Sequence, residues 1–293
     1  MVEKGASLTR VLRELEARGI LQGAGDVLLF ARFGDYATRM QAGEYELVAG
    51  LTARGLLELL ASGKVIYHEV SIIEGWTLRQ ALLALQAHPA ITATLPVDDR
   101  EALQQAFATE QYPEGIFFPD TYNFTRGTTD LELLQRARRQ MEQALATSWA
   151  GREGGLPYGS PYEALILASI IEKETSLREE QPRIAGVFVR RMRLNMRLQT
   201  DPTVIYGIGM AFDGNLTRTH LQEDTPWNTY TREGLPPTPI ALPGLGAIEA
   251  SMHPDSGDAL YFVARGDGSH YFSATLEEHN QAVRQYQLGE AAP

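Results

Sequence analysis

The stretch Ser160-Pro-Tyr-Glu-Ala-Leu-Ile-Leu-Ala-Ser-Ile-Ile-Glu-Lys-Glu-Thr175 decides the fold of this chain. Its first residues have the order of a helix start, with Ser160 as the cap and a proline next. Glu163 stands where a capping box requires an acidic side chain. Residues 164–171 are apolar with one exception, which predicts a helix buried on nearly every side. Glu172 is the first charged residue after this apolar run, and it deserves a chemical explanation.

A glutamate near the end of a helix is usually a solvated surface residue. Leu165, Ala168 and Ser169 share its side of the helix, however, so we expect the carboxyl group of Glu172 to be partly removed from water. Burial disfavours the charged form and raises the pKa of a carboxyl group. A carboxyl group that keeps its proton near neutral pH can protonate the leaving oxygen of a sugar–sugar bond. We therefore interpret Glu172 as a candidate general acid.

The composition of the chain excludes several classes of function. Its 293 residues and 44% hydrophobic content are those of a globular protein, and its net charge of −11 argues against nucleic acid and anionic lipid as general partners. The absence of cysteine excludes disulfides, thiol nucleophiles, thiolate zinc sites and iron–sulfur clusters. The six histidines lack ligand spacing, and no phosphate-binding glycine loop is present. We expect no metal and no cofactor. No apolar run is long enough to span a membrane.

The predicted fold class is α+β, with a small α/β subdomain at residues 1–75 and a mixed, helix-rich domain at residues 76–293. In the subdomain, periodicity predicts helices at 7–18, 26–36 and 52–62, and strands at 43–48 and 64–73. In the larger domain, periodicity predicts helices at 77–87, 99–109, 129–147, 160–175, 179–194 and from 275 onward, and a short helical turn is predicted to begin at 201. The sequence also predicts a long irregular loop at 223–246. A β-hairpin is predicted from the segments 258–265 and 270–274.

Polar and aromatic side chains gather in the segments 197–207 and 227–230. Planar polar groups that meet hydroxyls, together with rings that stack on pyranose faces, are typical of sugar binding. The candidates are Gln199, Asp201, Tyr206, Asn228 and Tyr230. For Asp201 the pattern favours helix capping, and Tyr206 has core packing as its alternative. For the other three residues, binding and structural roles remain equally open.

Several motifs resemble the YceG-like family of endolytic murein transglycosylases. They are Glu114-Gly-Ile-Phe-Phe-Pro-Asp-Thr-Tyr122, the run 167–175, Leu198-Gln-Thr-Asp-Pro-Thr-Val-Ile-Tyr-Gly207, Asn228-Thr-Tyr230, Gly234-Leu-Pro-Pro-Thr-Pro-Ile240, Tyr261-Phe-Val and His270-Tyr-Phe272. The likeness extends in order over essentially the whole chain, and residues 1–75 resemble the LysM-like subdomain of this family. One departure is Leu242-Pro-Gly, where the family usually has Asn-Pro-Gly.

The resemblance implies an enzyme, a lyase that cleaves the β-1,4 bond between N-acetylmuramic acid (MurNAc) and N-acetylglucosamine (GlcNAc). It implies 1,6-anhydro-MurNAc ends and Glu172 as the catalytic residue, acting as acid and then as base. Since Glu174 lies two residues further on, we expect it on a different helix face and not as a partner of Glu172. We assign substrate binding, as a hypothesis, to Gln199, Thr200, Asp201, Tyr206, Asn228, Tyr230 and Glu114. Glu114 also remains open as a distant second carboxylate.

The resemblance further implies a bacterial cell membrane location. It implies an N-terminal transmembrane anchor that this chain lacks, with the catalytic body on the periplasmic or cell-wall side. The implied partners are peptidoglycan glycan strands and peptidoglycan synthases, the penicillin-binding proteins. The alternative function is a noncatalytic peptidoglycan-binding or scaffold protein of the cell-wall synthesis machinery. A peptidase is not supported, because the chain has no nucleophile or metal set.

Overall fold

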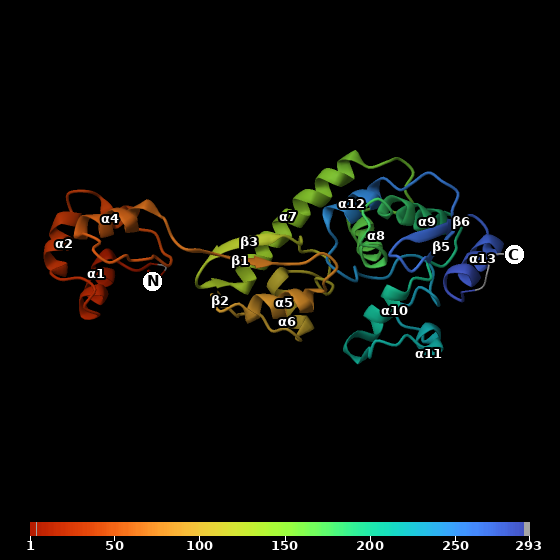
Figure 1. The fold of residues 1–293 in the computed structure, drawn as a ribbon, viewed down its shortest axis with the longest axis horizontal. Helices are drawn as coiled ribbons and strands as arrows, with labels where there is room; N and C mark the ends of the chain where they lie inside the picture. Colours follow the sequence, from red (N-terminus) through yellow and green to blue (C-terminus); the bar gives the residue numbers. More distant parts are fainter. Residues whose placement is uncertain (4, 290–293) are drawn as a thin grey trace. The chain divides into compact units, whose positions relative to one another are not determined.

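The structure, a computed structural model, describes residues 1–3 and 5–289. The chain forms two compact units. The first comprises residues 1–70, 85–94 and 121–133, and the second comprises residues 71–84, 95–120 and those from 134 onward. In the described residues, helices dominate and the strands form two-stranded sheets, so the predicted α+β class is confirmed (Figure 1). The LysM-like assignment of residues 1–75 and the boundary at residue 75 stay predictions.

The helices of the first unit pack around one apolar core. They are α1 (Leu8–Ala17), α2 (Ala24–Ala31), α3 (Tyr36–Arg39) and α4 (Ala53–Ser62). Leu12 and Leu57 are fully buried in this core. Two of the helices begin at capping residues, since the side chain of Ser7 accepts a hydrogen bond from the backbone of Arg10 and that of Thr52 accepts one from Gly55.

Two predicted elements of the first unit are wrong. The helix predicted at 26–36 ends at Ala31; residues 32–35 form a turn, and α3 begins at Tyr36 after Asp35, whose φ of 50° is left-handed. Aspartate tolerates this conformation better than most residues do, and the left-handed residue keeps α3 from continuing the direction of α2. The strand predicted at 43–48 is reduced to one bridge between Gly43 and Val2. Strand residues need a paired neighbour, and residues 44–48 form no ladder in the described part of the chain.

Two small sheets involve the first unit. The strand β1 (Tyr67–Ser71) pairs with β3 (Thr121–Thr125), and β2 (Ile91–Thr92) pairs in parallel with β4 (Thr128–Thr129). The start of β3 includes Thr121 and Tyr122, the last residues of the motif that begins at Glu114. Further along the chain are the helices α5 (Leu78–Ala87), α6 (Arg100–Phe107), α7 (Asp130–Gly151), α9 (Gln181–Arg193), α10 (Asp201–Ile208), η1 (Gly209–Ala211) and α11 (Arg218–Gln222).

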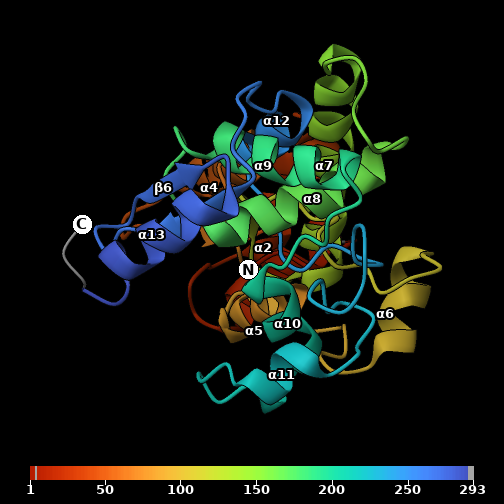
Figure 2. The ribbon, with the colours of Figure 1, turned by 90° about the vertical axis from the view of Figure 1, so that its right-hand side faces the viewer.

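The helix α8 (Pro161–Glu174) forms the centre of the second unit. Its capping box is present, because the side chains of Ser160 and Glu163 each accept a hydrogen bond from the other's backbone. The residues from Ala164 to Ile171 are all buried. The helix lies between α9 and α12 (Leu245–Met252) on one side and α10 on the other (Figure 2). The apolar side chains of α8 are thus covered by neighbouring helices, as a helix without a polar face requires.

Of the C-terminal elements, β5 (Tyr261–Ala264) packs onto α9, and α13 (Leu276–Tyr286) packs onto β5 and β6 (His270–Ser273). The strands β5 and β6 are antiparallel, with Tyr261 opposite Ser273 and Ala264 opposite His270. The helix α13 follows and begins with a capping box. Among the described residues, no helix has both the length and the apolar character needed to cross a lipid bilayer.

Candidate active site

Glu172 lies in the last turn of α8, where the helix leaves the core. Its side chain is half-buried, and Oε2 accepts a hydrogen bond of 3.0 Å from the backbone N–H of Gly244. Gly244 is the N-cap of α12, so the carboxyl group also faces the positive end of that helix. A Cβ atom on Gly244 would lie 2.0 Å from Oε1 of Glu74, which places a second carboxyl group against the same glycine.

A groove of about 340 Å³ opens beside Glu172. One wall is the segment before α5 and the start of that helix, and the other is the end of α8 with the residues after it. The lining residues are Glu74, Gly75, Trp76, Gln80, Glu172, Lys173, Glu174, Thr175 and Ser176. The groove therefore combines three carboxyl groups, one ammonium group and one indole ring.

The wall before α5 is held by the backbone of Leu242. The N–H of Gly75 donates to the carbonyl oxygen of Leu242 at 2.9 Å, and the N–H of Leu242 donates to that of Trp76 at 2.7 Å. The side chain of Leu242 is fully buried. At the position where the family usually has asparagine, this chain therefore uses a side chain that packs and a backbone that positions Trp76.

Burial raises the pKa of the Glu172 carboxyl group above its ordinary value. The hydrogen bond from Gly244 acts against burial, and the nearby charge of Glu74 acts with it. The positive charges of Arg178 and Lys173 lower the pKa of Glu172 and so offset part of the effect of burial. Arg178 lies 3.6 Å from Glu74, and the ammonium group of Lys173 donates to the carbonyl oxygen of Gly75 at 3.3 Å. The result is a carboxyl group that is protonated over a wider pH range than a solvated glutamate.

The predicted residues 199–201 lie next to this helix end. The hydroxyl group of Thr200 donates to Oε1 of Glu174, two residues from Glu172. The carboxylate of Asp201 accepts a hydrogen bond of 2.5 Å from the hydroxyl group of Tyr230. Gln199 is exposed, with a left-handed φ of 52°, and its N–H donates to the carbonyl oxygen of Thr229 at 3.1 Å. This segment is thus tied both to α8 and to the loop around residue 229.

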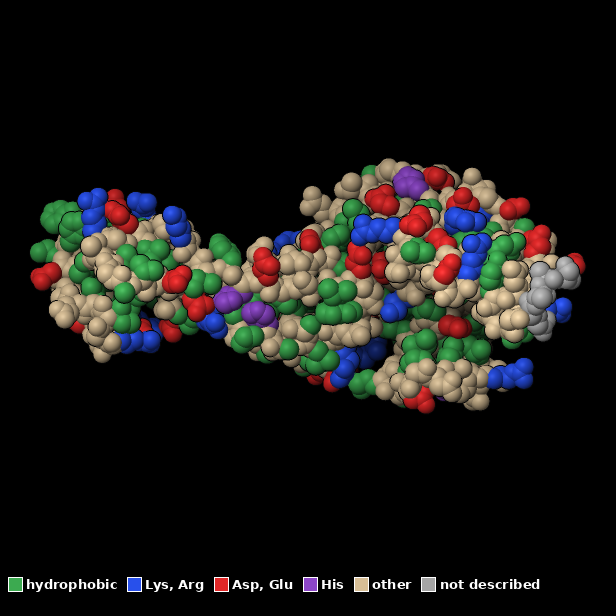
Figure 3. Space-filling model, in the orientation of Figure 1, with side chains coloured by type: hydrophobic (Ala, Val, Ile, Leu, Met, Phe, Trp, Pro, Cys, Tyr) green, Lys and Arg blue, Asp and Glu red, His purple; other side chains and the backbone are tan. Residues whose placement is uncertain are grey.

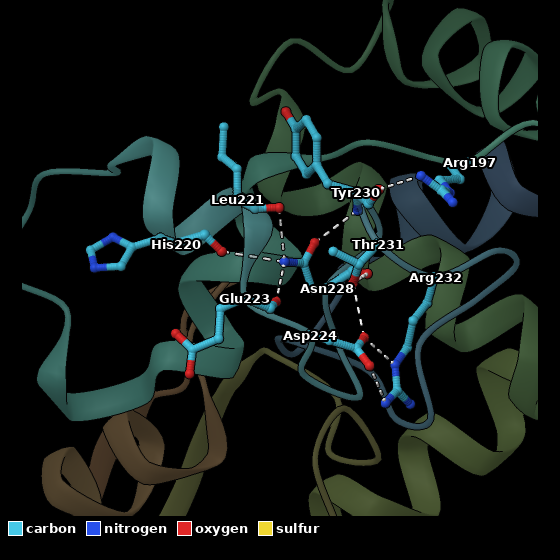
Figure 4. Close-up of polar contacts among 9 residues, drawn as sticks. All are labelled: Arg197, His220, Leu221, Glu223, Asp224, Asn228, Tyr230, Thr231 and Arg232. Carbon is cyan, nitrogen blue, oxygen red and sulfur yellow. Dashed lines mark hydrogen bonds and ion pairs between the residues drawn. The ribbon is translucent and has the colours of Figure 1, made fainter.

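Asn228 organises the loop that follows α11 (Figure 4). Its side chain is fully buried. The amide nitrogen is directed at the carbonyl oxygens of His220, Leu221 and Glu223, at 3.3, 3.2 and 2.6 Å. The amide oxygen accepts a hydrogen bond of 2.8 Å from the N–H of Tyr230. In this structure the amide holds backbone and does not present its atoms to a groove.

Glu114 is buried, with 1% of its surface exposed. Its Oε1 accepts a hydrogen bond of 2.7 Å from the N–H of Leu78, the first residue of α5, and its Oε2 accepts one of 3.1 Å from the hydroxyl group of Tyr206 on α10. Burial raises the pKa of Glu114 to about 7, although both hydrogen bonds act to lower it. The buried Glu114 therefore links two parts of the site. One is the start of α5, which forms part of the groove wall, and the other is Tyr206 on α10.

Of the predicted site residues, Glu172 lines the groove. The other seven form a hydrogen-bonded framework around α10 and the loop 223–230, which reaches the groove through the bond from Thr200 to Glu174. The other eight lining residues were not among the predicted site residues, and those on the wall before and at the start of α5 with side chains that can bind or react are Glu74, Trp76 and Gln80. The sequence signal that could have found them is the Glu-Gly-Trp-Thr run before a helix, which combines an acid and an indole at a turn.

On the face drawn in Figure 3, acidic and basic side chains are interspersed, without a continuous basic stripe. Within residues 1–3 and 5–289, no group of three or more His, Cys, Asp and Glu side chains is arranged to hold a metal ion.

The chain belongs to the YceG-like family, whose family model matches residues 1–285. It is 30% identical over 305 residues to the endolytic murein transglycosylase of Bacillus subtilis (strain 168), with 97% of this chain and 83% of the relative covered. It is 27% identical to the endolytic murein transglycosylase of Streptococcus pneumoniae serotype 2, again over 97% of this chain, but spans 57% of that protein. A crystal structure of a YceG-like protein from Listeria monocytogenes is similar, with a TM-score of 0.62, 29% identity and coverage of 96% and 97%.

Proposed function

We propose that this protein is an endolytic lytic transglycosylase of peptidoglycan, which cleaves the β-1,4 bond between MurNAc and GlcNAc. The observation that carries the proposal is the half-buried Glu172, whose raised pKa suits a proton donor in a groove that holds an indole ring. The names of the bacterial relatives support the same activity.

In the proposed reaction, the Glu172 carboxyl group gives its proton to the bridging oxygen while the bond from this oxygen to C1 of MurNAc breaks. GlcNAc leaves with a free 4-hydroxyl group. The Glu172 carboxylate then takes the proton of the C6 hydroxyl group of the same MurNAc, whose oxygen attacks C1. The products are a 1,6-anhydro-MurNAc end and a regenerated acid, and no water is consumed. Because the attack is intramolecular, one carboxyl group serves both steps.

The groove offers groups for each part of such a substrate. The ring of Trp76 suits the apolar face of a pyranose, and Gln80 and Ser176 supply polar groups for its hydroxyls and acetamides. The Gly244 N–H holds Oε2 of Glu172, which leaves Oε1 as the oxygen for proton transfer. We retain Gln199 and Tyr230 as proposed contacts of a long glycan strand, and we propose framework roles for Thr200, Asp201, Tyr206, Asn228 and Glu114.

Glu74 is the groove carboxyl group that could support hydrolysis instead. Ordinary glycosidases use two carboxyl groups, one of which activates water or attacks C1. In this structure Glu74 lies 3.6 Å from Arg178 and raises the pKa of Glu172. We propose that its charge keeps Glu172 protonated and that it takes no part in bond making. The end groups of the products distinguish the two mechanisms.

The test is digestion of defined, uncrosslinked glycan strands with analysis of the ends by mass spectrometry. Ends lighter by one water than reducing ends are expected. Glu172→Gln should retain the fold and lose cleavage by a factor of about a thousand or more, since the acid and the base are lost together. Glu179→Gln, at an exposed glutamate just before α9, is the matched control. Reducing ends would make the protein a hydrolase. Glycan binding by the unmodified protein without release would favour the noncatalytic alternative.

The cellular setting is proposed from the same relationship. We propose that the protein acts on the cell-wall side of the membrane, with residues 1–75 as a LysM-like subdomain and with an N-terminal membrane anchor. Peptidoglycan synthases are the proposed protein partners, because endolytic cleavage of nascent strands must follow their polymerisation.

A further inference from the structure

We infer that Glu174 is a positioning residue: by holding Thr200, it fixes the segment 199–201 and the loop behind it at the end of α8, in the geometry that cleavage by Glu172 requires. The inference rests on the proposed function, because it assigns a second role within the same groove. Because Glu174 is two residues from Glu172, the two side chains lie on different faces of α8. In the structure Glu174 contacts Thr200.

The location of Glu174 connects two parts of the site. It is the last residue of α8 and lines the groove, yet its Oε1 accepts a hydrogen bond from Thr200, whose side chain is 2% exposed. Thr200 is the N-cap of α10, and no side-chain capping bond is formed there. Its hydroxyl group is therefore committed to α8 and not to its own helix. The hydrogen bond joins the catalytic helix end directly to the start of α10.

Thr200 is the first member of a buried threonine cluster. The hydroxyl group of Thr203 donates to the carbonyl oxygen of Thr200 at 2.8 Å and lies 2.9 Å from that of Thr229. Oγ1 of Thr229 accepts a hydrogen bond of 3.1 Å from the N–H of Thr200. All three side chains are at most 2% exposed. The cluster thus connects the bond at Glu174 to residues 228–230, because hydrogen bonds that share donors and acceptors strengthen one another.

The charges around Glu174 come from three packed elements. Asp201 at the start of α10 opposes its ionisation, while His270 on β6 and Arg191 on α9 favour it. The guanidinium group of Arg191 is occupied, since it donates to the carbonyl oxygens of Leu260 and Leu198 at 2.7 and 2.8 Å. Burial is the largest effect and raises the pKa of Glu174 to about 7. The hydroxyl of Thr200 is thus bonded to a carboxyl group that titrates near neutrality.

Titration should change the strength of this hydrogen bond. A carboxylate accepts a stronger hydrogen bond than a neutral carboxyl group does, because the bond is charge-assisted. We therefore expect the segment 199–201 to be held more firmly as the pH rises through about 7. Glutamine keeps a neutral acceptor of the same shape, and alanine removes the acceptor. These two substitutions separate a positioning role from a general structural one.

The experiment measures kcat/KM on uncrosslinked glycan for Glu174→Ala, Glu174→Gln, Thr200→Val and the double variant Glu174→Ala/Thr200→Val. We expect a ten- to hundredfold loss for Glu174→Ala, of the size found for hydrogen bonds to charged groups, and a smaller loss for Glu174→Gln. The double variant should lose no more than the worse single variant, since both single changes break one bond. The ratio of unmodified to Glu174→Gln activity should rise as the pH increases through about 7. Glu179→Ala is the control.

A second measurement separates this inference from the proposed function. Glycan affinity is compared between Glu172→Gln and Glu172→Gln/Glu174→Ala, where no cleavage occurs, and we expect about tenfold weaker binding in the latter. Additive losses in the double variant, or equal losses for Glu174→Ala and Glu174→Gln in folded protein, would overturn the positioning role. Unchanged affinity together with unchanged kcat/KM would overturn it as well. If the unmodified protein releases no anhydro ends, the proposed function fails, and the affinity comparison alone still decides the role of Glu174.

Discussion

The exchange Glu114→Gln replaces a buried titrating group with a neutral amide of the same shape. The folded protein binds the proton of Glu114 more tightly than the unfolded chain does, because burial raises the pKa from the ordinary value of 4.5 to about 7. Below about pH 4.5 both states carry the proton. Between 4.5 and 7 the unfolded chain releases it first, so the folded state loses stability as the pH rises, and the loss is complete above 7.

The magnitude follows from the size of the pKa change. Each pKa unit corresponds to about 1.4 kcal/mol, so the full change amounts to about 3 kcal/mol between pH 4.5 and pH 8. Glutamine does not titrate, and its amide oxygen can still accept the hydrogen bond from Leu78. The variant should therefore gain about 3 kcal/mol relative to the unmodified protein over this pH range. Other titrating groups, such as Glu174, are present in both proteins and cancel in the difference.

The assay is denaturant unfolding followed by tryptophan fluorescence. The three tryptophans, Trp76, Trp149 and Trp227, all belong to the second unit, so the signal reports the unit that contains Glu114. Free energies of unfolding are measured at several pH values from 4.5 to 8. Glu101→Gln, at an exposed glutamate on α6, makes the same change in net charge and serves as the control. Parallel stability curves for Glu114→Gln and the unmodified protein would refute the argument.

Two further substitutions test the framework of the second unit by the same fluorescence assay. Asn228→Ala should destabilise it by roughly 3 kcal/mol, because three carbonyl oxygens and one N–H lose a buried partner; a loss below about 0.5 kcal/mol would contradict the bonding described. Gly115→Ala should cost about 2 kcal/mol or more, because its φ is 79° and a Cβ would lie 2.3 Å from that of Pro239. Gly155 has a φ of 75° and open space around it, so Gly155→Ala measures the loss of stability that comes from the backbone conformation alone. An equal loss of stability in both variants would exclude a contribution from the clash with Pro239.

Local signals predicted helix starts well. The capping box of Ser160 and Glu163 was predicted from sequence because its hydrogen bonds join residues three apart. The break after Ala31 was missed, since apolar periodicity alone does not reveal the turn at 32–35 or the left-handed conformation of Asp35. The strand predicted at 43–48 was wrong for a different reason. Strand formation depends on a pairing partner elsewhere in the chain, and here the pairing is limited to the bridge between Gly43 and Val2.

The sequence by itself determined the α+β class, the central apolar helix and the position of Glu172 at its end, because each of these depends on residues within a few positions of one another. The tertiary structure alone decided the surroundings of that carboxyl group. Gly244, Glu74 and Trp76 lie some 70 to 100 residues away along the chain and reach Glu172 through backbone pairing and helix packing. Such contacts have no local signature, because they arise from how the buried surfaces of separate elements fit together.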